Sequence, residues 1–183
     1  VEFEGGRTPL PQNNLPDLGS GLAMSKGYYR GSPMGELSGW TLSLWFEVSS
    51  DKKGDLLGIV RNENNGEAYR LTYENGSLSF GDPKQKKRPW KLVVDGVKKE
   101  QWNHVVISYG QATGPTLYLN SEKKAQGGRG QMGYATQFDH YHFGAAVLGK
   151  GKYGDYFDGK IDDFELHNRP FDGEEIKRLN KGE

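Results

Sequence analysis

The fold of this chain is decided by the stretch Phe157-Asp-Gly-Lys-Ile-Asp-Asp-Phe-Glu-Leu-His-Asn-Arg-Pro-Phe-Asp-Gly-Glu-Glu-Ile-Lys-Arg-Leu179. From Ile161 to His167, successive residues are expected to point to opposite faces, as they do in a half-buried β-strand. One face of this strand is expected to carry Asp162, Phe164 and Leu166, and the other face Ile161, Asp163, Glu165 and His167. Pro170 has no amide hydrogen to donate to a sheet, so the sequence predicts that the strand ends there.

A short helix is expected directly after this strand. Asp172 stands where a helix N-cap belongs, and Glu175 three residues later completes a capping box. Phe171 before the cap and Ile176 inside the helix have the spacing of a hydrophobic staple. The sequence therefore predicts that the chain finishes a β-sheet and then pins a small helix against it.

Short runs with strand-like alternation, separated by Gly, Pro and Asn, fill most of the remaining sequence. In the clearest run, Trp40 to Val48, one face is apolar and the other carries Trp45. A hairpin is expected around Asn75-Gly76, because this pair readily adopts the positive φ angles that a tight turn needs. Other strands are expected at 22–30, 55–61, 68–73, 77–81, 102–109, 115–120 and 138–144, and a loop at 150–157.

Four stretches of the sequence form one set: Trp40-Thr-Leu-Ser-Leu-Trp-Phe46, Gln101-Trp-Asn-His-Val-Val-Ile-Ser-Tyr109, Thr116-Leu-Tyr-Leu-Asn120 and the stretch quoted at the outset. The set resembles the strands of laminin-G-like domains in the concanavalin A-like lectin-glucanase superfamily, from about residue 20 to the end. Ser121 departs from the pattern, since relatives usually have Gly after that Asn.

The resemblance implies an all-β fold, a two-sheet antiparallel β-sandwich (a concanavalin A-like jelly roll) with a short C-terminal helix. Residues 1–183 are expected to form a single domain, in which residues 1–21 are an N-terminal strand and a wrapping loop. The same fold serves sugar binding, protein binding and catalysis in different proteins, so the fold alone does not fix the function.

The composition narrows the function classes. Lys and Arg number 24 and Asp and Glu also number 24, so no overall field favours nucleic acid or an anionic membrane. The sequence has no cysteine, which excludes a disulfide scaffold and cysteine-based metal or nucleophile chemistry. No apolar run is long enough to insert in a membrane. No signal peptide is recognisable, and Val1 is the start expected of a mature or trimmed chain.

Aromatic and polar side chains near expected loops and strand ends suggest a ligand-binding rim, because sugar sites combine aromatic faces with hydrogen-bonding groups. The candidates for ligand binding are Arg61, Arg88, Trp90, Tyr134, Asp139, His140, Tyr141, Tyr153, Asp155 and Tyr156. Lys84 to Arg88 form a basic run beside Trp90. This run either holds phosphate, sulfate or a sugar ring stacked on Trp90, or is a solvated loop with Trp90 tucked into the sandwich edge.

A structural calcium ion is one explanation for Asp162, which alternates with Phe164 and is expected to face inward. A buried carboxylate needs a hydrogen-bond partner or a cation, and calcium prefers oxygen ligands. Glu4, Asp162 and Asp163 are the candidate ligands if the N-terminal strand lies beside the last one. Hydrogen bonding to a neighbouring loop is the alternative.

Two histidines, His140 and His142, share a strand face and suggest zinc, but a third ligand in register is missing from the pattern, which favours packing or a wet face. Gly127 to Gly133 is rich in glycine but lacks the Gly-Lys-Ser/Thr of a phosphate loop. No Gly-x-Ser-x-Gly is present to support a serine nucleophile. A glycosidase needs two placed carboxylates, for which Asp163 and Glu165 on one face are the candidates.

Together with the resemblance, these patterns predict a non-catalytic carbohydrate-binding module. It is expected to be part of a larger secreted or cell-surface protein, covalently linked to neighbouring domains of a glycan-degrading enzyme, with a glycan as its partner. An adhesion or protein-binding module of a surface protein is the alternative, and a free-standing glycoside hydrolase is the third hypothesis.

Overall fold

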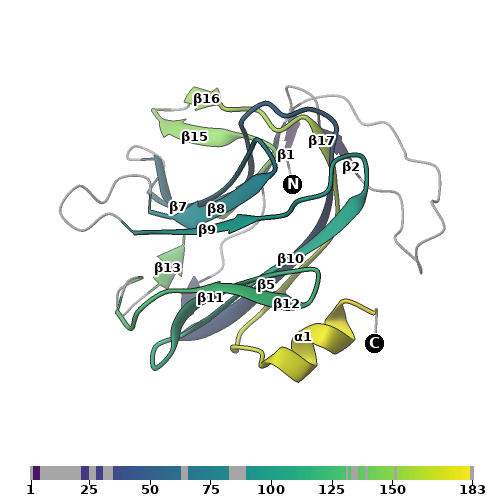
Figure 1. Ribbon diagram of the computed structural model, residues 1–183. Helices are drawn as coiled ribbons and strands as arrows, with labels where there is room; N and C mark the ends of the chain where they lie inside the picture. The colour runs from purple at the N-terminus through teal and green to yellow at the C-terminus, as the bar shows by residue number, and fades with distance from the viewer. Residues whose placement is uncertain are drawn as a thin grey trace.

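The computed structural model describes residues 2–4, 22–24, 28–30, 35–62, 66–82, 90–130, 132, 136–138, 140–150 and 152–181. These residues form two antiparallel sheets packed face to face, with one helix outside the sandwich (Figure 1). The predicted all-β sandwich with a closing helix is confirmed. Among the described residues, no helix has the length and apolar character needed to cross a lipid bilayer.

The first sheet has six strands, and the C-terminal strand lies inside it rather than at its edge. Its order is β12 (Glu122–Gln126), β11 (Gly114–Leu119), β10 (Trp102–Gly110), β5 (Gly39–Val48), β17 (Gly159–His167) and β2 (Leu22–Met24). Strand β5 therefore pairs with β17, from the far end of the chain. Two strands that are distant in the sequence are therefore neighbours inside the sheet.

The second sheet has seven strands and covers the other side of the core. Its order is β1 (Glu2–Glu4), β3 (Tyr28–Arg30), β14 (His140–Phe143), β6 (Gly54–Asn62), β7 (Gly66–Glu74), β8 (Ser77–Gly81) and β9 (Lys91–Asp95). Two further pairs stand apart from both sheets: β4 (Gly35–Leu37) with β13 (Thr136–Phe138), and β15 (Ala146–Gly149) with β16 (Lys152–Gly154).

The core lies between the two sheets and takes alternate residues from each strand. In β5 the inward residues Trp40, Leu42, Leu44 and Phe46 are all fully buried. Burying an aliphatic or aromatic side chain of this size contributes about 1.5–3 kcal/mol. Trp45 lies on the outer face, as its alternation predicts.

The turns follow the sequence signals. Asn75 and Gly76 have φ angles of 48° and 80°, which confirms the predicted hairpin between β7 and β8. Asn120 and Ser121 have φ angles of 52° and 67° between β11 and β12. Ser121 thus adopts a backbone conformation in which the resembled family has Gly, at some conformational cost.

Strand β17 contains a bulge that the alternating pattern did not predict. Asp162 pairs with Trp45 and Glu165 pairs with Ser43, so Asp163 and Phe164 together oppose a single residue of β5. Asp163 has a φ angle of 43°, the left-handed conformation of an extra residue. Because Ile161 pairs with buried Phe46, Asp162 lies on the outer face, and the prediction that it faces inward is wrong.

Two further expectations need correction. The predicted loop at 150–157 contains strand β16, which pairs with β15 in a hairpin. The N-terminal strand does not lie beside the last strand: β1 pairs with β3 in the seven-stranded sheet, whereas the short neighbour of β17 is β2. The segment predicted to wrap the sandwich at 5–21 lies outside the described residues.

The closing helix α1 (Gly173–Leu179) packs on the outer face of the six-stranded sheet (Figure 1). Its buried residue Ile176 contacts Val106 and Tyr118, and Phe171 packs against the same cluster. The Asp172 carboxylate accepts hydrogen bonds from the amides of Glu174 and Glu175, both at 2.9 Å. The predicted capping box is confirmed, and the helix is fixed at both its start and its apolar face.

Candidate functional site

The outer face of the seven-stranded sheet carries a hollow of about 330 Å³. Tyr69, Leu71 and Phe80 point into the core, so the residues that alternate with them point outward from β7 and β8. The hollow is lined by Arg70, Thr72, Ser79, Gly81, Asp82, Trp90 and Lys91. It is therefore a sheet-face site, built on rigid strands.

A fully buried carboxylate, Asp55, lies at one end of the hollow. Its Oδ2 atom is 2.8 Å from Nε of Arg70, and its Oδ1 atom accepts a hydrogen bond of 2.7 Å from the Thr72 hydroxyl. These two partners compensate a charge that burial would otherwise make costly. Asp55 in turn fixes the position of the Arg70 guanidinium.

The ion pairs continue outward from Arg70 to the surface. Its Nη1 atom is 3.5 Å from Oδ2 of Asp155, and the same oxygen accepts a 2.7 Å hydrogen bond from Nζ of Lys53. Asp155 and Lys53 are partly exposed. We call Asp55, Arg70, Asp155 and Lys53 the charge chain, since positive and negative groups alternate along it.

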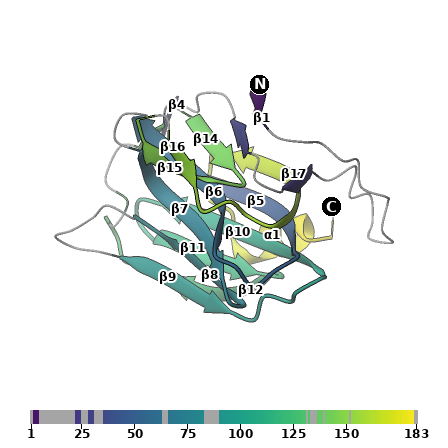
Figure 2. The same cartoon turned by 90° about the horizontal axis from the view of Figure 1, so that it is seen from above.

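The β15–β16 hairpin stands over the neighbouring part of the same sheet face. β15 lies against β6 and β7, as the view from above shows (Figure 2). The segment after the hairpin is tied to the start of β6, because the Asp55 amide donates to the Asp155 carbonyl at 2.8 Å. Tyr156, next in the chain, is 38% exposed and lies at this end of the sheet face.

The structure brings three of the predicted ligand-binding residues to this side of the molecule in accessible positions. Asp155 belongs to the charge chain, Tyr156 is exposed beside it, and Tyr153 of β16 is half-buried with its ring centroid 5.5 Å from that of His142. These three come from the expected Tyr- and Lys-rich segment. Asp155 reaches the hollow through its ion pair with Arg70, whereas Tyr153 lies over β14, farther along the sheet.

Other predicted residues are used for packing. Trp90 is 8% exposed and its ring centroid lies 5.9 Å from Tyr69 and 5.8 Å from Phe80, so Trp90 is tucked into the edge of the sandwich. Tyr141 points into the core, with its ring centroid 4.9 Å from Phe164. His140 is 2% exposed, on the face under the hairpin.

The remaining predicted residues cannot be placed in the hollow. Tyr134, Asp139 and the whole basic run, Arg88 included, lie outside the described residues, and the side chain of Arg61 does also. Asp55, Arg70, Thr72, Ser79 and Lys91 were not predicted from the sequence. The polar residues alternating with apolar ones along 69–73 and 78–80 were the available signal, since they mark an outward polar face.

The expected metal ligands do not converge in the part of the chain that the structure describes. No group of three or more His, Cys, Asp or Glu side chains there is placed to hold a metal ion. Glu4 belongs to the other sheet from Asp162 and Asp163. Oδ1 of Asp162 instead accepts the Asp163 amide at 2.9 Å. Calcium binding stays a prediction, which melting temperatures with and without a chelator test.

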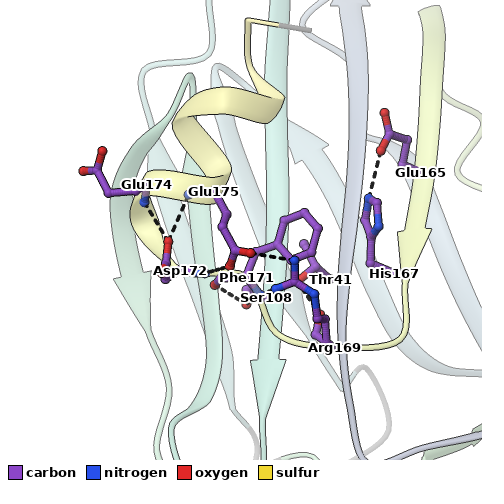
Figure 3. A network of polar contacts seen from close by, with 9 residues as sticks. All are labelled: Thr41, Ser108, Glu165, His167, Arg169, Phe171, Asp172, Glu174 and Glu175. Carbon is purple, nitrogen blue, oxygen red and sulfur yellow. Dashed lines mark hydrogen bonds and ion pairs between the residues drawn. The ribbon is translucent and has the colours of Figure 1, made fainter. Parts of the chain in front are cut away.

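A second hollow, of about 530 Å³, lies between β17 and α1 (Figure 3). Its side chains are paired with one another: Glu165 with His167 at 2.8 Å, and Arg169 with Glu175 at 2.6 Å. The Arg169 guanidinium also lies 4.4 Å from the Phe171 ring centroid. The Arg169–Glu175 pair holds the helix to the segment after β17, so we call Arg169, Phe171 and helix α1 together the helix latch.

The glycosidase hypothesis required Asp163 and Glu165 on one strand face. The bulge breaks that alternation, because Asp163 is its extra residue. Burial, together with the charges of Asp162 and Glu165, raises the pKa of Asp163. Asp163 and Glu165 are nevertheless both exposed, so the structure does not separate the two carboxylates, and the glycosidase hypothesis stays a prediction.

The fold is a lectin-type jelly roll. Its two antiparallel sheets pack face to face, the helix latch closes one side, and a polar hollow lies on the outer face of the other sheet. The chain belongs to the concanavalin A-like lectin/glucanases superfamily, whose laminin G family model matches residues 28–177. No curated protein matches the chain.

Several solved structures share this fold. A heptameric SAP-like pentraxin from Limulus polyphemus is 12% identical, with a TM-score of 0.69 over 95% of this chain and 80% of its own. The CBM40 of a Ruminococcus gnavus IT-sialidase, bound to α2,3-sialyllactose, is 15% identical, with a TM-score of 0.67 over 87% of this chain and 96% of its own.

The ligand-binding domain of botulinum neurotoxin serotype D, in complex with N-acetylneuraminic acid, is 16% identical, with a TM-score of 0.68 over 92% of this chain. This chain spans 44% of that structure's length. At such low identities these likenesses establish the fold alone.

Proposed function

We propose that this domain is a non-catalytic carbohydrate-binding module of a larger, secreted glycan-degrading protein, and that its glycan binds on the outer face of the seven-stranded sheet. The observation that carries the proposal is the hollow itself. It gathers outward polar side chains on neighbouring strands, and the exposed Tyr156 lies nearby, bridged to Asp55, the strand partner of the lining residue Thr72. Such a combination suits a sugar, which presents hydroxyl groups at its edge and C–H groups on its ring face.

The similar structures support the proposal by their ligands. The CBM40 is bound to α2,3-sialyllactose, and the botulinum domain is in complex with N-acetylneuraminic acid. A secreted location agrees with the laminin G family. The role in a glycan-degrading parent protein rests on the family resemblance.

A glycan array followed by affinity electrophoresis in soluble polysaccharides tests the proposal. The wild-type protein should bind at least one glycan, and Ser79→Tyr should abolish binding because the new ring fills the hollow. Ser77→Tyr is the matched control, since Ser77 lies two residues along the same strand face with its hydroxyl bonded to Asp95 at 2.6 Å. Tyr156→Ala should weaken binding.

If no glycan binds, the adhesion alternative takes precedence. If Ser77→Tyr and Ser79→Tyr reduce binding equally, the hollow is not the glycan site.

A further inference from the structure

We infer that Asn75 is a site of spontaneous modification, which the folded hairpin between β7 and β8 keeps unreacted. Asn75 is exposed and is followed by Gly76. In such a pair the backbone nitrogen of the glycine can attack the side-chain amide of the asparagine, because glycine has no side chain to hinder the approach. This chemistry belongs to the turn itself and does not depend on the proposed function.

The reaction closes a succinimide ring. The Gly76 nitrogen passes its proton to solvent and forms a bond to Cγ of Asn75, while the side-chain NH2 group takes up a proton and leaves as ammonia. Water then opens the ring at either of its carbonyl groups. One route leaves aspartate at position 75, and the other leaves isoaspartate, in which a side-chain carbon has entered the backbone. Both products carry a new negative charge.

The conformation of the turn holds the two reacting atoms apart. Glu74 pairs with Ser77, and the two residues between them, Asn75 and Gly76, have φ angles of 48° and 80°. Two positive φ angles in a two-residue loop define a type I′ turn. In this turn the nitrogen of the second residue lies nearly opposite the Cβ atom of the first about the Cα–C bond. The Gly76 nitrogen must therefore swing to the other side of that bond before the ring can close.

Three hydrogen bonds to groups outside the two turn residues oppose this rotation. The Gly76 amide, which is the nucleophile, donates to the Tyr73 hydroxyl at 3.0 Å. The Gly76 carbonyl accepts from the Val97 amide at 3.1 Å, and the Asn75 amide donates to the Asp51 carbonyl at 3.3 Å. Tyr73 is 1% exposed, and its hydroxyl also donates to Oδ1 of Asp51 at 3.3 Å. Cyclisation therefore requires a local opening of the turn.

The turn also sets the register of the two strands that carry much of the hollow. β7 and β8 supply its lining residues Arg70, Thr72, Ser79 and Gly81. Turn type and loop length fix the register of a hairpin, and isoaspartate would add one atom to the backbone of this turn. Modification of Asn75 should thus disturb the hollow from a distance.

Peptide mapping of the aged protein tests the inference. The full chain is incubated in mildly alkaline buffer, once folded and once in guanidinium chloride, and mass spectrometry follows the conversion of amide to acid at Asn75. The mapping must separate Asn75 from Asn65, which also precedes a glycine. We expect Asn75 to react at least about tenfold more slowly in the folded protein, because the ring closes only after the turn opens. Equal rates in the two states would overturn the inference.

A variant tests the hydrogen bond to the nucleophile. Tyr73→Phe removes the acceptor of the Gly76 amide and should speed the reaction in the folded protein by roughly threefold to tenfold, the equivalent of one neutral hydrogen bond. Tyr69→Phe is the matched control, since it removes from the same strand another buried hydroxyl, which donates to the Met132 carbonyl at 2.5 Å. It should leave the rate at Asn75 unchanged.

No acceleration in Tyr73→Phe, or equal acceleration in both variants, would overturn the role assigned to the turn. The comparison of the folded and unfolded wild-type protein decides the inference even if Tyr73→Phe does not fold.

Discussion

His104 lies between the six-stranded sheet and the end of α1, with 1% of its surface exposed. Its Nε2 atom accepts from the Ser43 hydroxyl at 2.7 Å, and its Nδ1 atom donates to Oδ1 of Asn180 at 2.9 Å. The ring stacks on Trp45, with centroids 4.7 Å apart. Burial lowers the pKa of His104 to about 4, against a smaller opposing effect of the Asn180 hydrogen bond. The neutral imidazole therefore ties the helix latch to the sheet.

This low pKa predicts a loss of stability in acid. Unfolding returns the imidazole to its ordinary pKa of about 6.5, so the unfolded state binds more protons between pH 6.5 and 4. The contribution of His104 is fully present above about pH 6.5 and falls as the pH drops to about 4, by about 3 kcal/mol in all. Urea unfolding at a series of pH values measures the slope of the unfolding free energy against pH. His104→Gln should flatten it, and a slope unchanged in that variant would contradict the assignment.

Two glycines are expected to respond in opposite directions to alanine. A Cβ atom on Gly54 would lie 2.6 Å from Cα of Phe157 and 2.8 Å from the Tyr156 carbonyl oxygen, whereas a Cβ atom on Gly173 would meet nothing within 4 Å. Gly54→Ala should destabilise the fold by about 1–3 kcal/mol and shift the segment that carries Tyr156. Gly173→Ala, in the first turn of α1, should stabilise it by up to about 1 kcal/mol. Thermal unfolding of both variants checks the signs, and equal effects would refute the close approach at Gly54.

At the scale of elements, α1 is held by a small satellite core on the outer sheet face. Ile176 is fully buried there against Val106 and Tyr118. Ile176→Ala should cost about 2–4 kcal/mol, because removing a buried aliphatic side chain loses both its transfer free energy and its packing. Lys177→Ala, an exposed neighbour, should change the stability by less than about 0.5 kcal/mol. Chemical denaturation compares them, and a near-neutral Ile176→Ala would mean that the helix is not fastened by this contact.

The strands and the helix were predictable where one local signal dominates. Asp172 and Glu175 define the capping box, and Asn75-Gly76 defines its turn, because each pattern depends on residues close in sequence. The bulge at Asp163 was not predictable, since its reason is the pairing with β5. An alternating sequence pattern does not reveal that one of its acidic residues has a left-handed backbone conformation.

The candidate site was predicted only in part, for the same reason. Tyr153, Asp155 and Tyr156 were found because they cluster in one segment, but Arg70 and Asp55 are partners across two strands. Trp90 was ambiguous in sequence, since an aromatic residue beside a basic run fits both a rim and a core. Its contacts with Tyr69 and Phe80 decide for the core.

At the scale of the whole molecule, stability should be concentrated where sequence-distant segments meet. β5 lies between β10 and β17, and its residues from Trp40 to Leu44 are buried on both faces, because the latch covers the outer side that the core does not. β12 ends the six-stranded sheet, and most of its residues are exposed. Opening β12 exposes little apolar surface, whereas freeing β5 requires both sheets to separate.

Native-state hydrogen exchange should therefore divide the six-stranded sheet into two classes. Amides of β5 and β10 should exchange only through global unfolding, with free energies equal to the denaturant value, whereas amides of β12 should exchange through local opening at a lower free energy. The Ile176→Ala variant should lower the protection of β5 and β10 by its full loss of stability and leave β12 nearly unchanged. If β12 and β5 lost the same amount of protection, the sheet would open as one unit. The stability would then be spread over the whole sandwich rather than concentrated in its central pair of strands.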